Sequence, residues 1–162
     1  IRDRVSIAQD KEGFLWFATE EGLNKFDGTR FITYYKNETR NGYGITGNEL
    51  NCLLDDPKDS ILWIGTQRAG LNAYDYVNDT FTFYRHNEAV PESIITDDVT
   101  NIIAADDGNL WVTTYWKGIY VECTSVSFAQ EINGLPVGRK YRVTVFACMG
   151  GQVGMLAVFR II

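Results

Sequence analysis

The stretch GFLWFATEEGLNKFDG, residues 13–28, joins an apolar run around a tryptophan to a charged pair, a Gly-Leu-Asn step and an Asp-Gly end. The stretches ILWIGTQRAGLNAYDY and NLWVTTYWKGIYVE, which begin at residues 61 and 109, follow the same order. The tryptophans recur at intervals of 47 and 48 residues, at Trp16, Trp63 and Trp111. The glycines recur every 48 residues, at Gly22, Gly70 and Gly118. A period in the forties is typical of propellers and related repeat architectures.

Each repeat consists of short β-rich runs separated by turn residues. In the first repeat, residues 10–13 and Asp27-Gly28 lie between such runs, and Asp-Gly between β-type runs is a strong hairpin signal. Four short antiparallel strands in a unit of about 47 residues make one blade of a β-propeller. The sequence therefore predicts an all-β fold: a propeller fragment of about three four-stranded antiparallel blades with an irregular β-rich C-terminal tail.

The repeats also predict the internal boundaries. Blade 1 is expected at residues 1–36, blade 2 at 50–85 and blade 3, which matches incompletely, at 99–122. Residues 123–162 lose the pattern but remain β-rich. This tail is compatible with an aberrant terminal blade, an appendage or an altered reading frame, and the residues do not decide among these.

Composition excludes several classes of function. The 162 residues are 45% hydrophobic, enough for a core, and their net charge of −6 argues against binding to a phosphate backbone. Three scattered cysteines and one histidine support no disulfide framework, zinc site or histidine-based catalytic triad. No signal peptide opens the chain, and no apolar run is long enough to span a bilayer. We expect no metal, no cofactor and no nucleic-acid partner.

The turn between the second and third strands varies while the frame around it repeats, which makes it the candidate binding site. Aromatic rings there offer stacking surface, and charged groups offer hydrogen bonds to hydroxyls or carboxylates. The predicted ligand-binding residues are Glu20, Glu21, Arg68, Tyr115, Trp116 and Lys117. An ordinary exposed turn, or packing against the next blade, is the simpler alternative.

The repeated tryptophans and two aspartates could have functional roles, but each group also has a structural explanation. The repeated tryptophans could be sugar-stacking platforms, but their fixed place in the second strand favours packing between blades. The repeated glycines are expected to serve the turns. Asp10 and Asp27 could act as a general acid and base in glycoside hydrolysis. Both lie at hairpin turns, where capping of the turn is the more economical role.

The runs QDKEGFLWFATEEGLNKFDG, ILWIGTQRAGLNAYD and NLWVTTYWKG resemble two-component regulator propeller repeats, over residues 5 to about 121. Such repeats occur in the periplasmic sensor region of hybrid two-component histidine kinases, especially those of gut Bacteroidetes. The resemblance implies a periplasmic, non-catalytic propeller segment that senses a ligand, commonly an oligosaccharide. It also implies the remaining blades of a sensor as partners. Because three blades alone would expose sheet faces that neighbouring blades normally cover, self-association of the chain is the alternative.

Two alternative functions are also compatible with the sequence. One is a propeller glycoside hydrolase or sialidase-like enzyme, although the first repeat separates Asp and Gly by one residue more than the sialidase motif does. Quinone-dependent dehydrogenase propellers, which also repeat Gly and Trp, use wider spacing. The other alternative is a propeller that recruits a protein partner. No kinase motif is present, so the chain is expected to have no enzymatic activity of its own.

Overall fold

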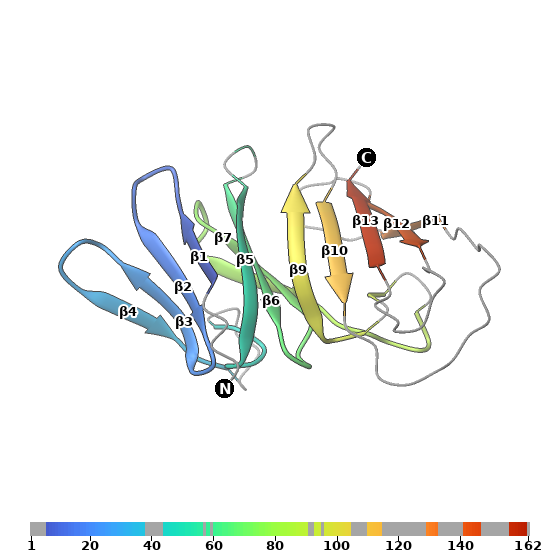
Figure 1. The fold of residues 1–162 in the computed structure, drawn as a ribbon, viewed down its shortest axis with the longest axis horizontal. Coiled ribbons are helices and arrows are strands. Elements are labelled where there is room, and N and C mark those ends of the chain that lie inside the picture. Colours follow the sequence, from blue (N-terminus) through green and yellow to red (C-terminus); the bar gives the residue numbers. More distant parts are fainter. Residues whose placement is uncertain are drawn as a thin grey trace.

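In the part of the chain that the structure describes, antiparallel strands form three sheets (Figure 1). A computed structural model describes residues 6–37, 44–56, 58, 60–90, 93–94, 96–104 and 110–114, and the backbone of strands at 129–132, 141–146 and 156–161. These residues contain no helix, which confirms the predicted all-β fold class. In the same part of the chain, accordingly, no helical segment meets the length and hydropathy needed to traverse a bilayer.

The first two sheets are simple meanders in which each strand pairs with the next. The first sheet contains β1 (Ser6–Gln9), β2 (Leu15–Thr19), β3 (Gly22–Phe26) and β4 (Phe31–Tyr34). The second contains β5 (Leu50–Asp56), β6 (Ile61–Thr66), β7 (Leu71–Asp75) and β8 (Thr80–Tyr84). Both are four-stranded and antiparallel throughout, as expected for propeller blades.

The third sheet differs from the expected blade. It begins with β9 (Val99–Ala104) and β10 (Leu110–Thr114), which form the same hairpin as the first strands of the other sheets. The strand on the other side of β10 is β13 (Leu156–Ile161), followed by β12 (Tyr141–Phe146) and β11 (Ala129–Ile132). The sheet thus has five strands. Three of them come from the tail, and β13 pairs along the second edge of β10.

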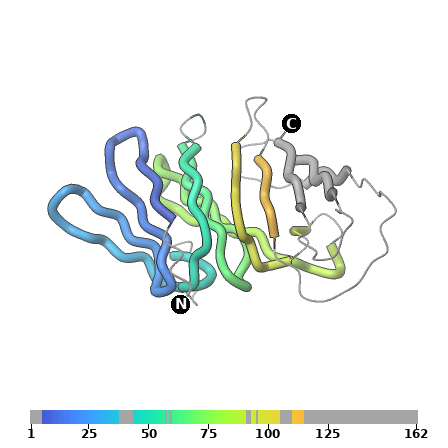
Figure 2. Tube along the Cα trace, in the orientation of Figure 1, coloured from blue at the N-terminus to red at the C-terminus, as the bar shows by residue number. Residues whose placement is uncertain are grey.

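The sheets stand one after another, and their first strands β1, β5 and β9 are neighbours (Figures 1 and 2). One apolar cluster fills the seam between the first and second sheets and includes Trp16, Leu23, Leu62 and Tyr74. A second cluster between the second and third sheets is built around Trp63, with Val99 and Leu110 among its members. The core therefore consists of layers between sheets, as in a propeller.

The position of the second sheet between the other two explains its burial pattern. In β2 buried and half-buried residues alternate, as is typical of a strand with one covered face. Every residue of β6, from Ile61 to Thr66, is buried, because neighbouring sheets cover both of its faces.

Candidate ligand-binding site

A repeated threonine holds the turn between the second and third strands of the first and second sheets. The Thr19 Oγ1 hydroxyl donates to the Gly22 carbonyl at 2.8 Å, and the Thr66 Oγ1 hydroxyl donates to the Gly70 carbonyl at 2.6 Å. Both threonines follow the repeated tryptophan by three residues, and Thr114 occupies the same place in the third repeat. Sequence reasoning missed this role, although the Trp-x-x-Thr spacing was visible.

In the first and second sheets, the glycine that closes the turn is tied to the segment that connects one sheet to the next. The Gly22 amide donates to the Asn48 carbonyl at 2.9 Å, and the Gly70 amide donates to the Asp97 carbonyl at 2.8 Å. Turns and connections therefore share one end of the first and second sheets.

The glycines are needed for a steric reason as well as for the turn. Gly22 and Gly70 have φ angles of 117° and 89°, in the region that favours glycine. A Cβ atom at Gly22 would lie 2.7 Å from the Tyr34 carbonyl oxygen, and a Cβ at Gly70 would overlap the Tyr84 carbonyl oxygen. Each glycine thus lets the turn approach the backbone at the end of the fourth strand.

The predicted binding residues that the structure describes lie at this end and are exposed. Glu20 and Glu21 occupy the turn of the first sheet, and Arg68 occupies that of the second with a φ of 66°. The Gln67 amide donates to the Glu49 carbonyl at 2.8 Å, so the Asn48-Glu49 connection touches both turns. The remaining predictions fall outside the described residues: Tyr115, Trp116, Lys117 and Gly118.

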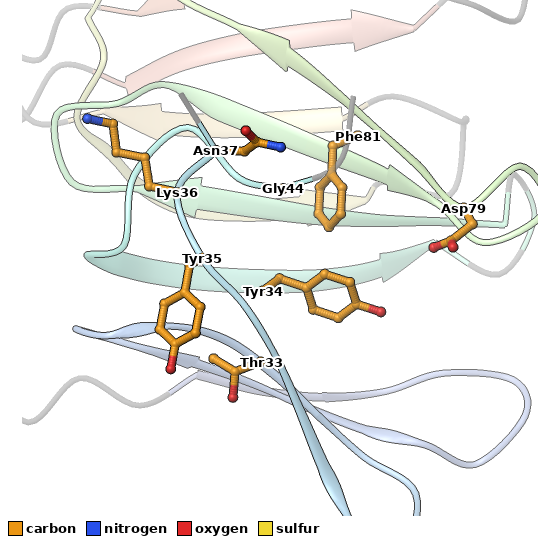
Figure 3. Close-up of a pocket in the computed structure, with 8 residues that line it drawn as sticks. All are labelled: Thr33, Tyr34, Tyr35, Lys36, Asn37, Gly44, Asp79 and Phe81. Atoms are coloured by element: carbon orange, nitrogen blue, oxygen red, sulfur yellow. The ribbon is translucent and has the colours of Figure 1, made fainter. Parts of the chain in front are cut away.

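A pocket of about 350 Å³ lies elsewhere, at the edge formed by the last strands of the first and second sheets (Figure 3). It combines aromatic rings with hydroxyl, amide, ammonium and carboxylate groups. None of the predicted turn residues lines it. Its lining residues are Thr33, Tyr34, Tyr35, Lys36, Asn37, Gly44, Asp79 and Phe81.

Backbone pairing builds one wall of the pocket. A parallel bridge joins Lys36 to Ile45, and the Asn37 amide donates to the Ile45 carbonyl at 3.0 Å. Gly44 has a φ of 131°, and a Cβ there would lie 2.8 Å from the Tyr35 carbonyl oxygen. The wall is therefore closely packed, and a side chain at Gly44 would disrupt it.

Aromatic residues form the opposite wall and carry hydrogen-bonding groups. The rings of Tyr34 and Phe81 lie 5.4 Å apart, and the Tyr74 hydroxyl donates to Asp79 Oδ1 at 2.7 Å. Burial raises the pKa of both Tyr34 and Tyr74, and the bond to Asp79 adds to the rise for Tyr74. Both phenols therefore remain protonated at neutral pH. Tyr35, which is 60% exposed, adds accessible ring surface to the pocket.

Asp10 has a structural role that the sequence only partly predicted. Its carboxylate accepts hydrogen bonds from the Glu12 amide at 3.0 Å and the Phe14 amide at 2.9 Å, which is the expected capping of the turn. It also accepts from Trp16 Nε1 at 2.8 Å inside the core. A buried carboxylate with these three donors is held in place and is poorly placed to act as a general acid.

The second sheet lacks this bond between aspartate and tryptophan. Asp56 is buried where the β5–β6 turn begins, but the turn is one residue longer than that after Asp10. Trp63 is buried, and its Nε1 atom has no hydrogen-bond partner within the described residues. The missing bond thus accompanies the longer turn, although Asp56 pairs with Ile61 in the same register in which Asp10 faces Phe14.

The other candidate acid, Asp27, is an exposed turn cap. It accepts from the Thr29 and Arg30 amides at 2.8 and 2.7 Å, and these bonds to Arg30 and Thr29 lower its pKa. The described residues also contain no group of three or more side chains able to ligate a metal ion.

Comparison with known proteins places these features in a family. Residues 2–21 match the family model described as "Two component regulator propeller". The chain is 42% identical to the extracellular domain of the BT3049 hybrid two component system from B. thetaiotaomicron, with a TM-score of 0.69. That match covers 94% of this chain and 23% of the solved domain, so this chain spans about a quarter of its relative.

Two further comparisons add little. The extracellular domain of the BT4673 hybrid two component system from B. thetaiotaomicron is 16% identical over 95% of this chain and 28% of its own length. Its TM-score is 0.31, too low to bear on the fold. A search of curated proteins found no significant match. The sequence match and the shared architecture with BT3049 show that the repeats of this chain belong to the two-component regulator propeller family.

Proposed function

We propose that this chain is a ligand-sensing segment of an extracytoplasmic receptor, non-catalytic by itself, and that its ligand is an oligosaccharide. The observation that carries the proposal is the 42% identity to the extracellular domain of a hybrid two component system. The location outside the cytoplasm follows from the same relative. Signalling would require modules beyond this segment.

The pocket between the first and second sheets is the site that best suits a sugar. Sugar rings present apolar faces that stack on aromatic side chains, and their hydroxyl groups need hydrogen-bonding partners of both kinds. Tyr35 supplies exposed ring surface, and Asp79 and Asn37 supply acceptors (Figure 3). A neutral oligosaccharide fits this mixture better than an anion does, because a carboxylate lines the pocket.

A binding event in this pocket has a physical route to the turns. The Lys36 amide donates to Asn48 Oδ1 at 2.6 Å, and the Asn48 carbonyl accepts from Gly22 at 2.9 Å. A shift of the pocket wall at Lys36 would therefore move the connection and the Glu20-Glu21 turn with it. We propose that the turns report occupancy of the pocket to neighbouring parts of the receptor.

The enzyme alternative receives little support from the described side chains. Asp10 is buried beneath three donors and Asp27 caps a turn, so neither faces the pocket. A recognition protein needs shape, stacking and hydrogen bonds, which the pocket supplies without reactive groups.

Titration calorimetry against xylo-, manno- and cello-oligosaccharides and N-acetyllactosamine tests the proposal. We expect one of these sugars to bind, and Tyr35→Ala to weaken binding by about tenfold or more, equivalent to about 1.4 kcal/mol of lost stacking. Phe83→Ala, which removes an exposed ring outside the pocket, is the matched control and should bind normally. A loss of binding in Arg68→Ala instead would locate the ligand at the turns. Failure of the folded protein to bind any of these sugars would count against the oligosaccharide.

A further inference from the structure

A carboxylate stands at one end of the pocket between the first and second sheets. Asp79 lines that end, and the aromatic side chains of Tyr34 and Phe81 line the adjoining wall (Figure 3). Among the residues that the structure describes, Asp79 accepts a hydrogen bond from Tyr74 and forms no ion pair. The exposed carboxylate is therefore available to pair with a positive charge on a ligand.

A buried tyrosine holds this carboxylate in place. The hydroxyl of Tyr74, a residue only 5% exposed, donates to Asp79 Oδ1 at 2.7 Å. The centroid of the Tyr74 ring lies 4.8 Å from that of Phe81 and 5.8 Å from that of Tyr34, so ring packing fixes the donor. Because a carboxylate accepts several hydrogen bonds, Asp79 Oδ2 keeps its capacity to bind a ligand.

The backbone of the β7–β8 turn is unusual at the same residue. Asp79 has a φ of 53°, in the left-handed region that few residues other than glycine adopt. The β3–β4 turn of the first sheet meets its need for a positive φ with a glycine, Gly28 at 96°. The second sheet thus places a charged side chain where glycine would fit more easily, and that side chain lines the pocket.

The charged groups of the pocket lie at its two ends. Lys36 lies opposite Asp79, and its ammonium group points away from the carboxylate (Figure 3). Burial is the main reason why the pKa of Tyr34 is raised, and the negative charge of Asp79 adds to the rise, so the carboxylate acts on a ring of the pocket wall. An aromatic surface beside a carboxylate attracts an ammonium group.

The nature of the sugar follows from this arrangement, and the inference rests on the proposed function. We propose that the pocket selects a saccharide that carries a protonated amino group, and that Asp79 pairs with this group beside the rings of Tyr34 and Phe81. The exposed Tyr35 ring remains available to stack on the sugar. A neutral saccharide of the same shape makes the stacking contact without the ion pair, and it binds more weakly.

Titration calorimetry at about pH 5.5, where amines are protonated, tests the inference with matched trisaccharides. The linear glucosamine trimer has the linkage of cellotriose and carries ammonium groups in place of hydroxyl groups, and its N-acetylated form is neutral. We expect the glucosamine trimer to bind about tenfold or more tightly than either neutral trimer. Asp79→Asn should abolish this preference, because asparagine keeps the shape and tolerates the positive φ. Unchanged affinity of the variant for cellotriose would show that it is folded.

Two controls separate the proposed ion pair from general attraction to an acidic protein. Glu12→Gln removes one negative charge at the exposed β1–β2 turn and should leave all affinities unchanged. Spermidine, which carries ammonium groups without a sugar ring, should bind more weakly than the glucosamine trimer. Equal affinity for spermidine, or a preference for the glucosamine trimer that survives Asp79→Asn, would overturn the inference.

The outcome for the neutral sugars distinguishes this inference from the proposed function. Equal affinity for cellotriose and the glucosamine trimer, with both weakened by Tyr35→Ala, would overturn the role of the amino group and leave an oligosaccharide as the ligand. Absence of binding by all the trimers would overturn the inference and count against the proposed function as well.

Discussion

Gly22 and Gly28 illustrate two different reasons why this fold needs glycine: a positive φ angle, and a close approach to neighbouring backbone. Both have positive φ angles, 117° and 96°, which alanine adopts only with strain. At Gly28 an added Cβ would meet nothing within 4 Å, whereas at Gly22 it would lie 2.7 Å from the Tyr34 carbonyl oxygen. That oxygen cannot easily retreat, because Tyr34 is paired with Leu23 in the sheet.

We therefore expect Gly22→Ala to lower the free energy of unfolding by about 3 kcal/mol and Gly28→Ala by about 1 kcal/mol. Urea denaturation followed by tryptophan fluorescence measures both. Gly28→Ala serves as the control for backbone strain alone. Equal losses in the two variants would mean that the close approach to Tyr34 contributes nothing.

The sequence predicted these glycines as turn residues but could not predict the contact with the fourth strand. Spacing along a chain reveals which positions repeat, and a positive φ is a local property that glycine indicates. The distance from Gly22 to Tyr34 depends on how the fourth strand ends. Asp10 illustrates the same limit, because its cap was predicted and its bond to Trp16 Nε1 was not.

At the scale of elements, the β5–β6 turn offers a direct test of the bond between aspartate and tryptophan. Deleting Pro57 and replacing Ser60 with glycine would give Asp56 the same spacing to Trp63 that Asp10 has to Trp16. Ser60 already has a φ of 57°, which suits glycine. We expect the buried Trp63 Nε1 to gain its missing acceptor and the free energy of unfolding to rise by about 1 kcal/mol or more.

Chemical denaturation of the shortened protein measures that gain. The matched control carries Asp56→Ala in the same shortened background and should lose the gain, since it has the short turn without the carboxylate. If both shortened proteins were equally stable, the turn itself would be responsible and Asp56 would not contact Trp63.

The elements differ in how far periodicity could predict them. The strands of the first two sheets follow from local runs and turns that recur with the tryptophan. The partner of β10 does not follow, because β13 comes from the tail, beyond the last repeat. Residues 118–121, where the repeat pattern places the third strand of blade 3, lie outside the described residues. Pairing between segments far apart in sequence leaves no periodic signal for sequence reasoning to use.

At the scale of the molecule, the second sheet should be the most protected part. Neighbours cover both of its faces, and all of β6 is buried, whereas the face of the first sheet opposite Trp16 exposes Ile7 and Phe31. We expect amides of β6 to exchange with solvent at least tenfold more slowly than those of β2, because local opening costs more where both faces are packed. Hydrogen exchange with mass spectrometry at low protein concentration measures this. Equal protection of β2 and β6 would show that the sheets open together.

Fold class was the most predictable property of the whole molecule and the pocket the least. A repeated apolar pattern specifies sheets that stack, whatever their ligand. The pocket joins the end of β4 to the β7–β8 turn, so its walls come from different repeats. The predicted binding residues Glu20, Glu21 and Arg68 lie at the turns and do not line the pocket. Variation between repeats reveals exposed positions and not cavities.

The hydrogen bonds that hold each turn use the backbone of Gly22 or Gly70 and the hydroxyl of Thr19 or Thr66. The side chains between them are exposed in Glu20, Glu21 and Arg68. The hydrogen bonds that hold the turns thus do not depend on the exposed side chains that lie between threonine and glycine. The residues between threonine and glycine can therefore be exchanged while the blade stays intact, which makes these turns suitable acceptors for grafted loops.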